Sequence, residues 1–222
     1  MGNKRDPRYP ELMYANFGGF FTSKGFIMVV VNYRLSKGPG NESGNTHYPS
    51  GGEDCAGAIN WITKNLDEHR KVFLMGNSAE AVHVMTFLFE PMILNSLTAD
   101  VAGAIFLSPP CHQRKAPESR KPVNVAYYGS DEDVENNSPI RLLQCNGVSK
   151  IPMLSLVGEL DEGGIIGSWG DYKLEYEKMG GQIDEIWMMG HNHISPILGL
   201  NSTEKEGSQW GEDAVQWMRK YL

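Results

Sequence analysis

The sequence from residue 72 to residue 80 reads Val-Phe-Leu-Met-Gly-Asn-Ser-Ala-Glu. An apolar run here ends in glycine and serine, and apolar residues at helical spacing follow it as far as Pro91. This order is typical of a strand that turns sharply into a helix, which lifts Ser78 off the sheet edge beside the free N–H groups of the helix N-terminus. Ser78 is therefore a candidate nucleophile. The alternative is that Ser78 only caps the helix, as serine often does.

Outside this stretch, apolar runs alternate with stretches of helical period. The runs predicted as strands are residues 26–31, 72–75, 101–107, 151–157 and 183–189. The alternation predicts an α/β fold, a mostly parallel sheet with helices on both faces. The run 26–31 is rich in β-branched residues and almost continuously apolar, which predicts a central strand buried on both faces.

The length of the chain limits the number of domains, and its net charge limits the kinds of partner that it can bind. A chain of 222 residues can bury one sizeable core, so we expect a single domain over residues 1–222. The polar stretch 111–137 has little periodicity, and we expect it to form a lid-like insertion. The net charge of -7, from 27 acidic and 20 basic residues, disfavours nucleic acid and anionic membranes as partners. A small neutral substrate fits better.

Motifs for other classes of protein are absent from the sequence. The three cysteines form no Cys-x-x-Cys pair, so we expect reduced thiols and a cytoplasmic location. The N-terminus lacks the apolar segment of a signal peptide, and no run of 18 apolar residues occurs. The histidines show no zinc-binding spacing and no glycine-rich phosphate loop is present, so we expect neither a metal nor a cofactor.

An acid and a base follow the serine in the order that a nucleophilic serine requires in this class of fold. Asp161 comes just after the predicted strand 151–157, with Glu159 and Glu162 as competing carboxylates. The alternative is that these three carboxylates only form a solvent-exposed acidic loop. His191 and His193 follow the last predicted strand, and one of them is expected to be the base.

The motifs taken together resemble a known group of enzymes. They are Val31-Asn32-Tyr33-Arg34-Leu35-Ser36, Tyr48-Pro49, Glu53-Asp54, Gly76-Asn77-Ser78-Ala79, Tyr127-Tyr128-Gly129-Ser130, Gly158-Glu159-Leu160-Asp161 and His193-Ile194-Ser195. This set resembles the hormone-sensitive-lipase-like and feruloyl-esterase-like α/β hydrolases, a group that includes the arylformamidases. The resemblance covers most of the chain from about residue 26.

The resemblance implies specific roles. Ser78 would be the nucleophile, Asp161 the acid and His193 the base, with His191 as a neighbour. The backbone N–H of Ala79 would contribute to the oxyanion hole.

The sequence departs from the family in two places. Glu80 stands where the family's nucleophile turn usually has a glycine. The family's His-Gly-Gly loop, which supplies further oxyanion N–H groups, does not occur in these 222 residues. We therefore expect an N-terminally shortened fold whose sheet lacks its first strands, with an open edge strand that favours a homodimer.

Two functions follow from these observations. The first is a serine hydrolase of carboxylesterase or arylformamidase type, which cleaves a carboxylic ester or small amide through an acyl-enzyme intermediate. The second is a weakly active or non-catalytic relative that binds a small molecule. The missing loop favours the second, while the complete set of serine, acid and base favours the first.

Overall fold

One parallel sheet organises the part of the chain that the structure describes. The computed structural model describes residues 14–38, 44–66, 71–97, 100–112, 114, 116–202 and 205–222. The strands are β1 (Val72–Asn77), β2 (Val101–Leu107), β3 (Met153–Gly158) and β4 (Asp184–Met188). They pair in the order β1-β2-β3-β4, each parallel to its neighbour. Helices lie between consecutive strands, as parallel crossovers require.

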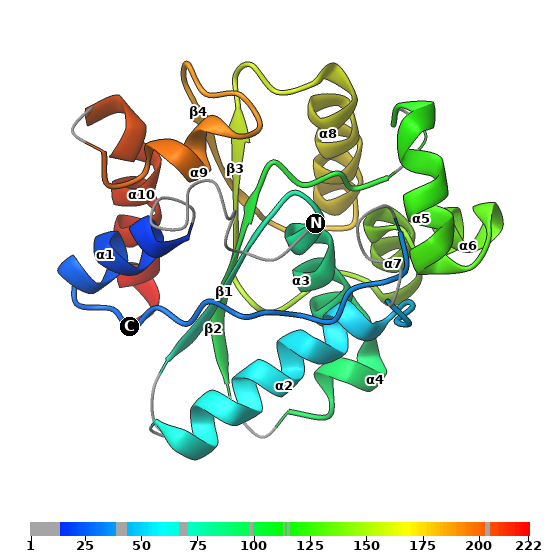
Figure 1. The fold of residues 1–222 in the computed structure, drawn as a ribbon, viewed down its shortest axis with the longest axis horizontal. Helices are drawn as coiled ribbons and strands as arrows, with labels where there is room; N and C mark the ends of the chain where they lie inside the picture. Colours follow the sequence, from blue (N-terminus) through cyan, green and yellow to red (C-terminus); the bar gives the residue numbers. More distant parts are fainter. Residues whose placement is uncertain are drawn as a thin grey trace.

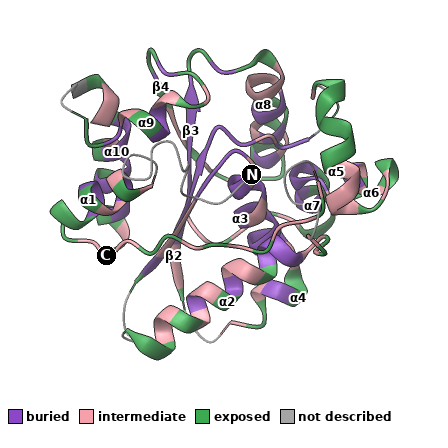
Figure 2. Ribbon diagram, in the orientation of Figure 1, coloured by how far each residue is buried: buried purple, intermediate pink, exposed green. Residues whose placement is uncertain are grey.

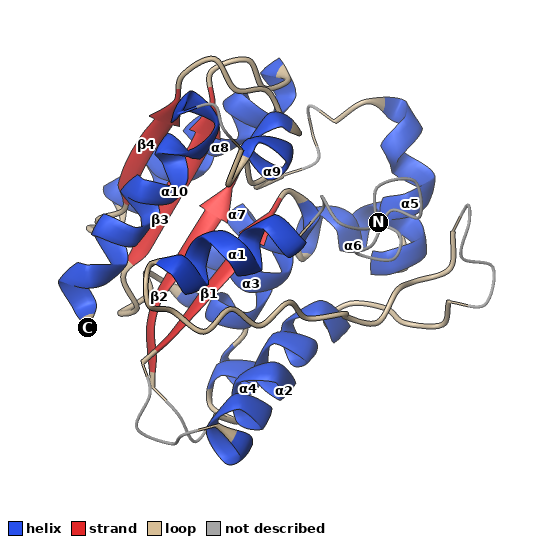
Figure 3. Ribbon diagram, turned by 60° about the vertical axis from the view of Figure 1, so that its left-hand side comes forward, coloured by secondary structure: helices blue, strands red, loops and turns tan. Residues whose placement is uncertain are grey.

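Helices cover both faces of this sheet (Figures 1 and 3). One face carries α1 (Ala15–Ser23), α9 (Ser195–Gly199) and α10 (Lys205–Met218). The other face carries α2 (Ser50–Asn65), α3 (Ala79–Phe89), α4 (Pro91–Leu94), α7 (Pro139–Asn146) and α8 (Gly163–Lys178). Within the described ranges, no helix has both the length and the apolar character needed to cross a bilayer. The predicted fold class, an α/β fold with a mostly parallel sheet, is confirmed.

The core consists of two apolar clusters, one on each face of the sheet. In β2, Ala104 and Phe106 belong to one cluster, whereas Ile105 and Leu107 belong to the other. All four are fully buried, because successive side chains of a strand point to opposite faces. Figure 2 shows that buried residues are concentrated in β2 and β3 and in the helices that pack on the sheet. The four predicted strands from residue 72 onward are thus present, with ends that differ by two residues at most.

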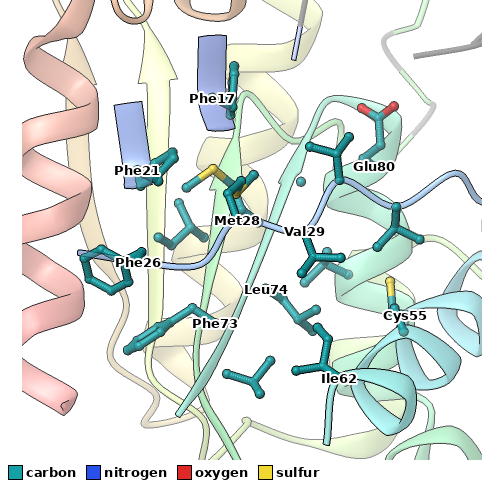
Figure 4. A pocket seen from close by; sticks show the side chains of 18 of the residues that line it. Phe17, Phe21, Phe26, Met28, Val29, Cys55, Ile62, Phe73, Leu74 and Glu80 are labelled. Carbon is teal, nitrogen blue, oxygen red and sulfur yellow. The ribbon is translucent and has the colours of Figure 1, made fainter. Parts of the chain in front are cut away.

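The predicted central strand at residues 26–31 is wrong. This segment is extended but belongs to no strand, and Ile27, Val29 and Val30 are exposed. It passes beside the edge of the sheet at β1, and a cavity of about 430 Å³ lies between the two (Figure 4). The apolar composition identified a segment suited to a sheet, but a strand also needs a neighbour close enough for backbone hydrogen bonds. That neighbour is missing among the described residues.

The polar stretch 111–137 is largely helical rather than irregular. It contains a 3₁₀ turn (Glu118–Arg120), α5 (Lys121–Tyr128) and α6 (Asp131–Asn136), while residues 113 and 115 lie outside the described part. Tyr128 stacks on Tyr48, which anchors α5 near the start of α2. A lid role for this stretch stays a prediction.

Candidate active site

Ser78 occupies the sharp turn between β1 and α3. Its backbone has φ 55° and ψ -116°, a strained conformation for a residue with a side chain. The turn brings α3 so close to β1 that a Cβ on Gly76 would lie 2.5 Å from the backbone N of Ala81, so only glycine fits there. Ser78 makes no side-chain capping hydrogen bond. The Ser78 hydroxyl therefore does not cap α3.

His193 lies between Ser78 and Asp161. Its Nε2 is 2.8 Å from Ser78 Oγ, and its Nδ1 is 2.9 Å from Asp161 Oδ1. Because a carboxylate only accepts, Nδ1 carries the hydrogen and Nε2 of the neutral ring accepts from the serine hydroxyl. Ser78 follows β1, Asp161 follows β3 and His193 follows β4. The carboxyl ends of parallel strands meet at one edge of a sheet. The fold therefore brings together residues that are up to 115 positions apart.

Two donors hold the second oxygen of Asp161. Ser108 Oγ donates to Oδ2 at 2.5 Å, and the backbone N–H of Gly158 donates to the same atom at 2.8 Å. The side chain of Asp161 has no exposed surface, so its charge depends on these donors and on His193. Gly158 must be a glycine, because a Cβ there would lie 2.8 Å from the carboxylate. These contacts fix the orientation of the Asp161 carboxylate.

Ser108 was not predicted from the sequence. It follows the last residue of β2, is buried and has φ 48°. Its position directly after a predicted strand and before two prolines was the available signal. A serine at a strand end is common, however, and only the structure places it against Asp161.

The competing candidates have other partners. His191 is buried, with Nδ1 at 3.0 Å from Ser195 Oγ and Nε2 at 3.1 Å from the carbonyl oxygen of Glu206. Glu159 accepts from the backbone N–H of Gly190 at 2.8 Å, and Glu162 is exposed at the start of α8. His191 and Glu159 therefore hold the loops around the site, and the residues that meet Ser78 are His193 and, through it, Asp161.

Ala79 is the first residue of α3, where a backbone N–H has no acceptor within its own helix. The N-terminus of α3 also carries a partial positive charge that favours an anion beside Ser78.

Among the described residues, no group of three or more histidine, cysteine or acidic side chains is arranged to hold a metal ion.

Glu80 is buried and is one of the residues that line the cavity beside β1, at whose periphery Figure 4 shows it. Its carboxylate accepts a hydrogen bond from the hydroxyl of Tyr33 at 3.2 Å. Burial and the charge of Glu80 together raise the pKa of Tyr33 well above its usual value, and they raise the pKa of Tyr14 to about 12. The side chain at this unusual position therefore contacts the segment that precedes α2.

Comparison of sequences finds no match, whereas comparison of structures finds proteins of similar fold. No protein-family model and no curated protein matches the chain. Its structure is similar to that of carboxyl esterase 2 from the fungus Tuber melanosporum, with a TM-score of 0.71 and 16% identity over 96% of this chain and 74% of the esterase. It is also similar to an esterase/lipase from an uncultured bacterium, with a TM-score of 0.66 and 17% identity over 86% of this chain and 64% of that one.

A fungal esterase from Rhizomucor miehei has a TM-score of 0.64 and 19% identity, over 86% of this chain and 62% of the esterase. The chain thus spans less than two thirds of the last two proteins. At such low identity the likeness concerns the fold. With its parallel sheet and two helical layers, the chain has the α/β-hydrolase fold of these esterases.

Proposed function

We propose that the chain is a serine hydrolase that cleaves a carboxylic ester or a small amide through an acyl-enzyme intermediate. The observation that carries the proposal is the pair of hydrogen bonds made by the His193 imidazole: Nε2 accepts from Ser78 Oγ at 2.8 Å, and Nδ1–H donates to Asp161 Oδ1 at 2.9 Å. A nucleophilic serine needs a base within hydrogen-bond reach, and the base needs a group that orients it. A serine that only capped a helix would need neither.

In the first step, Ser78 Oγ attacks the carbonyl carbon while His193 Nε2 takes the hydroxyl proton. Asp161 accepts from Nδ1 and stabilises the imidazolium that forms. The tetrahedral intermediate then collapses: the bond to the leaving oxygen or nitrogen breaks, and His193 gives its proton to that atom. The alcohol or amine departs, and the acyl group stays on Ser78 as an ester.

In the second step, His193 Nε2 removes a proton from a water molecule, whose oxygen attacks the acyl carbon. Collapse of the second intermediate breaks the bond to Ser78 Oγ, and the proton on His193 returns to that oxygen. The carboxylic acid leaves and the free enzyme is restored, so neither a cofactor nor a redox partner is consumed. During both steps the N–H of Ala79 would donate to the oxyanion.

The substrate class is an uncharged or weakly charged small molecule, because the chain carries a net charge of -7. Whether an ester or a formamide is preferred is decided by comparing p-nitrophenyl acetate and p-nitrophenyl butyrate with N-formylkynurenine. The sequence composition further supports a cytoplasmic protein that binds neither nucleic acid nor membrane, and the edge of β1 that no described strand pairs with favours a homodimer.

A fluorophosphonate probe tests the proposal, since only an activated serine reacts quickly with it. We expect rapid labelling of the chain, none in Ser78→Ala, and a loss of at least about a hundredfold in labelling rate in His193→Gln. A matched control is Ser155→Ala, which removes another buried serine hydroxyl, in β3, and should leave labelling unchanged. Equal labelling of the chain and of Ser78→Ala would refute the assignment.

The second candidate, a weakly active or non-catalytic binding protein, is favoured by one observation. The sequence contains no His-Gly-Gly loop, so Ala79 is the one oxyanion donor assigned in these 222 residues. Each missing donor costs about 2.7 to 4 kcal/mol in the transition state. This candidate predicts a folded chain with neither probe labelling nor ester hydrolysis, whereas the first predicts both.

A further inference from the structure

One buried histidine has no role in the proposed catalytic steps. His112 is 3% exposed, and its Nε2 is 3.0 Å from Oδ2 of Asp171 in α8. Because a carboxylate only accepts, Nε2 carries the hydrogen and donates to Asp171. His112 Nδ1 is buried without a hydrogen-bond partner among the described residues, which costs stability. An apolar side chain would avoid this cost, so the contact with Asp171 requires an explanation.

A short and stiff stretch of chain connects His112 to Ser108. Residues 108–112 read Ser-Pro-Pro-Cys-His. Each proline ring fixes its own φ angle, so few free rotations separate Ser108 from His112. Ser108 is the residue whose hydroxyl donates to Asp161 Oδ2 at 2.5 Å. A displacement of His112 is therefore transmitted to a residue that contacts the proposed catalytic acid.

The far end of this stretch is fixed to two helices. The backbone N–H of Cys111 donates to Ser168 Oγ in α8 at 3.2 Å, and its carbonyl oxygen accepts from the N–H of Ile140 in α7 at 3.1 Å. His112 adds its own hydrogen bond to α8 through Asp171. Ser168 and Asp171 are three positions apart, so they lie on one side of α8. Residues 111 and 112 therefore dock on one side of α8 and on the start of α7.

Ser108 needs support from both sides. Its φ of 48° lies in the left-handed region, which is strained for a residue with a side chain. A strained backbone persists only where the surrounding structure holds it. On one side, the Ser108 N–H donates to the carbonyl oxygen of Leu156 in β3 at 2.8 Å. On the other side, the stretch that ends at His112 supplies the second attachment.

The contact between His112 and Asp171 differs from an ordinary surface ion pair. Exposed ion pairs contribute little to stability, because water screens both charges and both side chains must be ordered. Here the imidazole is buried and thus already fixed in place, while the Asp171 side chain is half exposed. The contact can therefore be removed from the solvent side without opening the core.

We infer that His112 is a positioning residue for the proposed hydrolysis. Its hydrogen bond to Asp171 ties residues 108–112 to α8 and so keeps Ser108 Oγ on Asp161. The orientation of Asp161 in turn fixes His193. This inference rests on the proposed function, because the orientation of the acid matters only if His193 acts as a base. His112 acts through Ser108 rather than on the substrate.

Steady-state kinetics with p-nitrophenyl butyrate tests the inference. Asp171→Ala should lower kcat by about tenfold with KM unchanged, whereas Glu177→Ala, at an exposed position of the same helix, should change neither. His112→Gln keeps a side-chain N–H donor and should retain at least about half of kcat, while His112→Leu should lose about tenfold. In a Ser108→Ala background, Asp171→Ala should have no further effect. Equal losses in both backgrounds would show a merely structural role and overturn the inference.

Proton NMR separates this inference from the proposed function. The hydrogen between His193 Nδ1 and Asp161 gives a downfield signal, which is identified by its absence in His193→Gln. This signal should shift or broaden in the same way in Ser108→Ala and in Asp171→Ala, and it should stay unchanged in Glu177→Ala. These responses in a chain that hydrolyses no ester would refute the proposed function and still support the positioning of the acid. An unchanged signal and an unchanged kcat in folded Asp171→Ala would overturn the inference.

Discussion

Replacement of Ser108 by alanine tests whether the orientation of Asp161 matters for catalysis. The hydroxyl of Ser108 donates to Asp161 Oδ2 at 2.5 Å, while Oδ1 accepts from His193. In Ser108→Ala, the backbone N–H of Gly158 is the remaining donor to Oδ2. The carboxylate should then rotate more freely, and His193 should lose its fixed position beside Ser78.

The expected magnitude follows from the strength of this hydrogen bond. A hydrogen bond to a charged acceptor contributes about 1.5 to 3 kcal/mol. If that energy is lost in the transition state, where the imidazolium depends most on Asp161, kcat/KM falls by about ten- to 150-fold. The loss should appear in kcat rather than in KM, because Ser108 contacts the acid and not the substrate.

The assay is p-nitrophenyl butyrate hydrolysis, with kcat and KM determined separately and the fold checked by circular dichroism. Ser155→Ala is the matched control: Ser155 is equally buried, but its hydroxyl has no hydrogen-bond partner among the described residues. Its kcat should be unchanged. In an Asp161→Asn background, Ser108→Ala should have little further effect, since the two residues act as a unit.

An unchanged kcat in a folded Ser108→Ala protein would refute this reasoning. So would additive losses in the double variant, because additivity would mean that Ser108 acts independently of the acid.

Three further variants test the tight turn at Gly76, the role of His191 and the hydrogen bonds of Glu185. Gly76→Ala should lower the free energy of unfolding in urea by about 1 to 3 kcal/mol, because its Cβ would meet the backbone of α3 at 2.5 Å. His191→Gln should keep kcat on p-nitrophenyl butyrate within about threefold, since the ring is hydrogen-bonded to Ser195 at the start of α9 and to Glu206 in α10 rather than to Ser78 or Asp161; a hundredfold loss would make it the base. Burial alone would raise the pKa of Glu185, but hydrogen bonds from Lys173 and Trp169 hold it below its ordinary value. The charged form is therefore stabilised by folding above about pH 4, and Glu185→Gln should cost about 1 kcal/mol in urea at pH 7 and much less at pH 3; equal costs would contradict this.

The sequence predicted those features that depend on local signals. The apolar run before Gly76 and the helical spacing after Ser78 identified a strand, a tight turn and a helix, all of which the structure contains. The position of Asp161 just past a strand end was also local information. The α/β fold class followed from the alternation of such segments.

Other features depend on contacts between distant segments. Residues 26–31 have the composition of a buried strand, yet the described sheet offers them no partner, and composition does not reveal a partner. The choice between His191 and His193 depended on the resemblance, since two histidines in one loop are equivalent by position alone. The contact between Ser108 and Asp161 joins residues 53 positions apart, and no spacing rule predicts it.

The most direct test of the proposed mechanism is the mass of the chain during turnover. The protein is mixed with p-nitrophenyl acetate, quenched in acid within the first turnovers and measured by intact-protein mass spectrometry, and the modified peptide is then sequenced. We expect a mass increase of one acetyl group, located on Ser78 and absent from Ser78→Ala. Hydrolysis without an acyl adduct, or an adduct on another residue that persists in Ser78→Ala, would contradict the account.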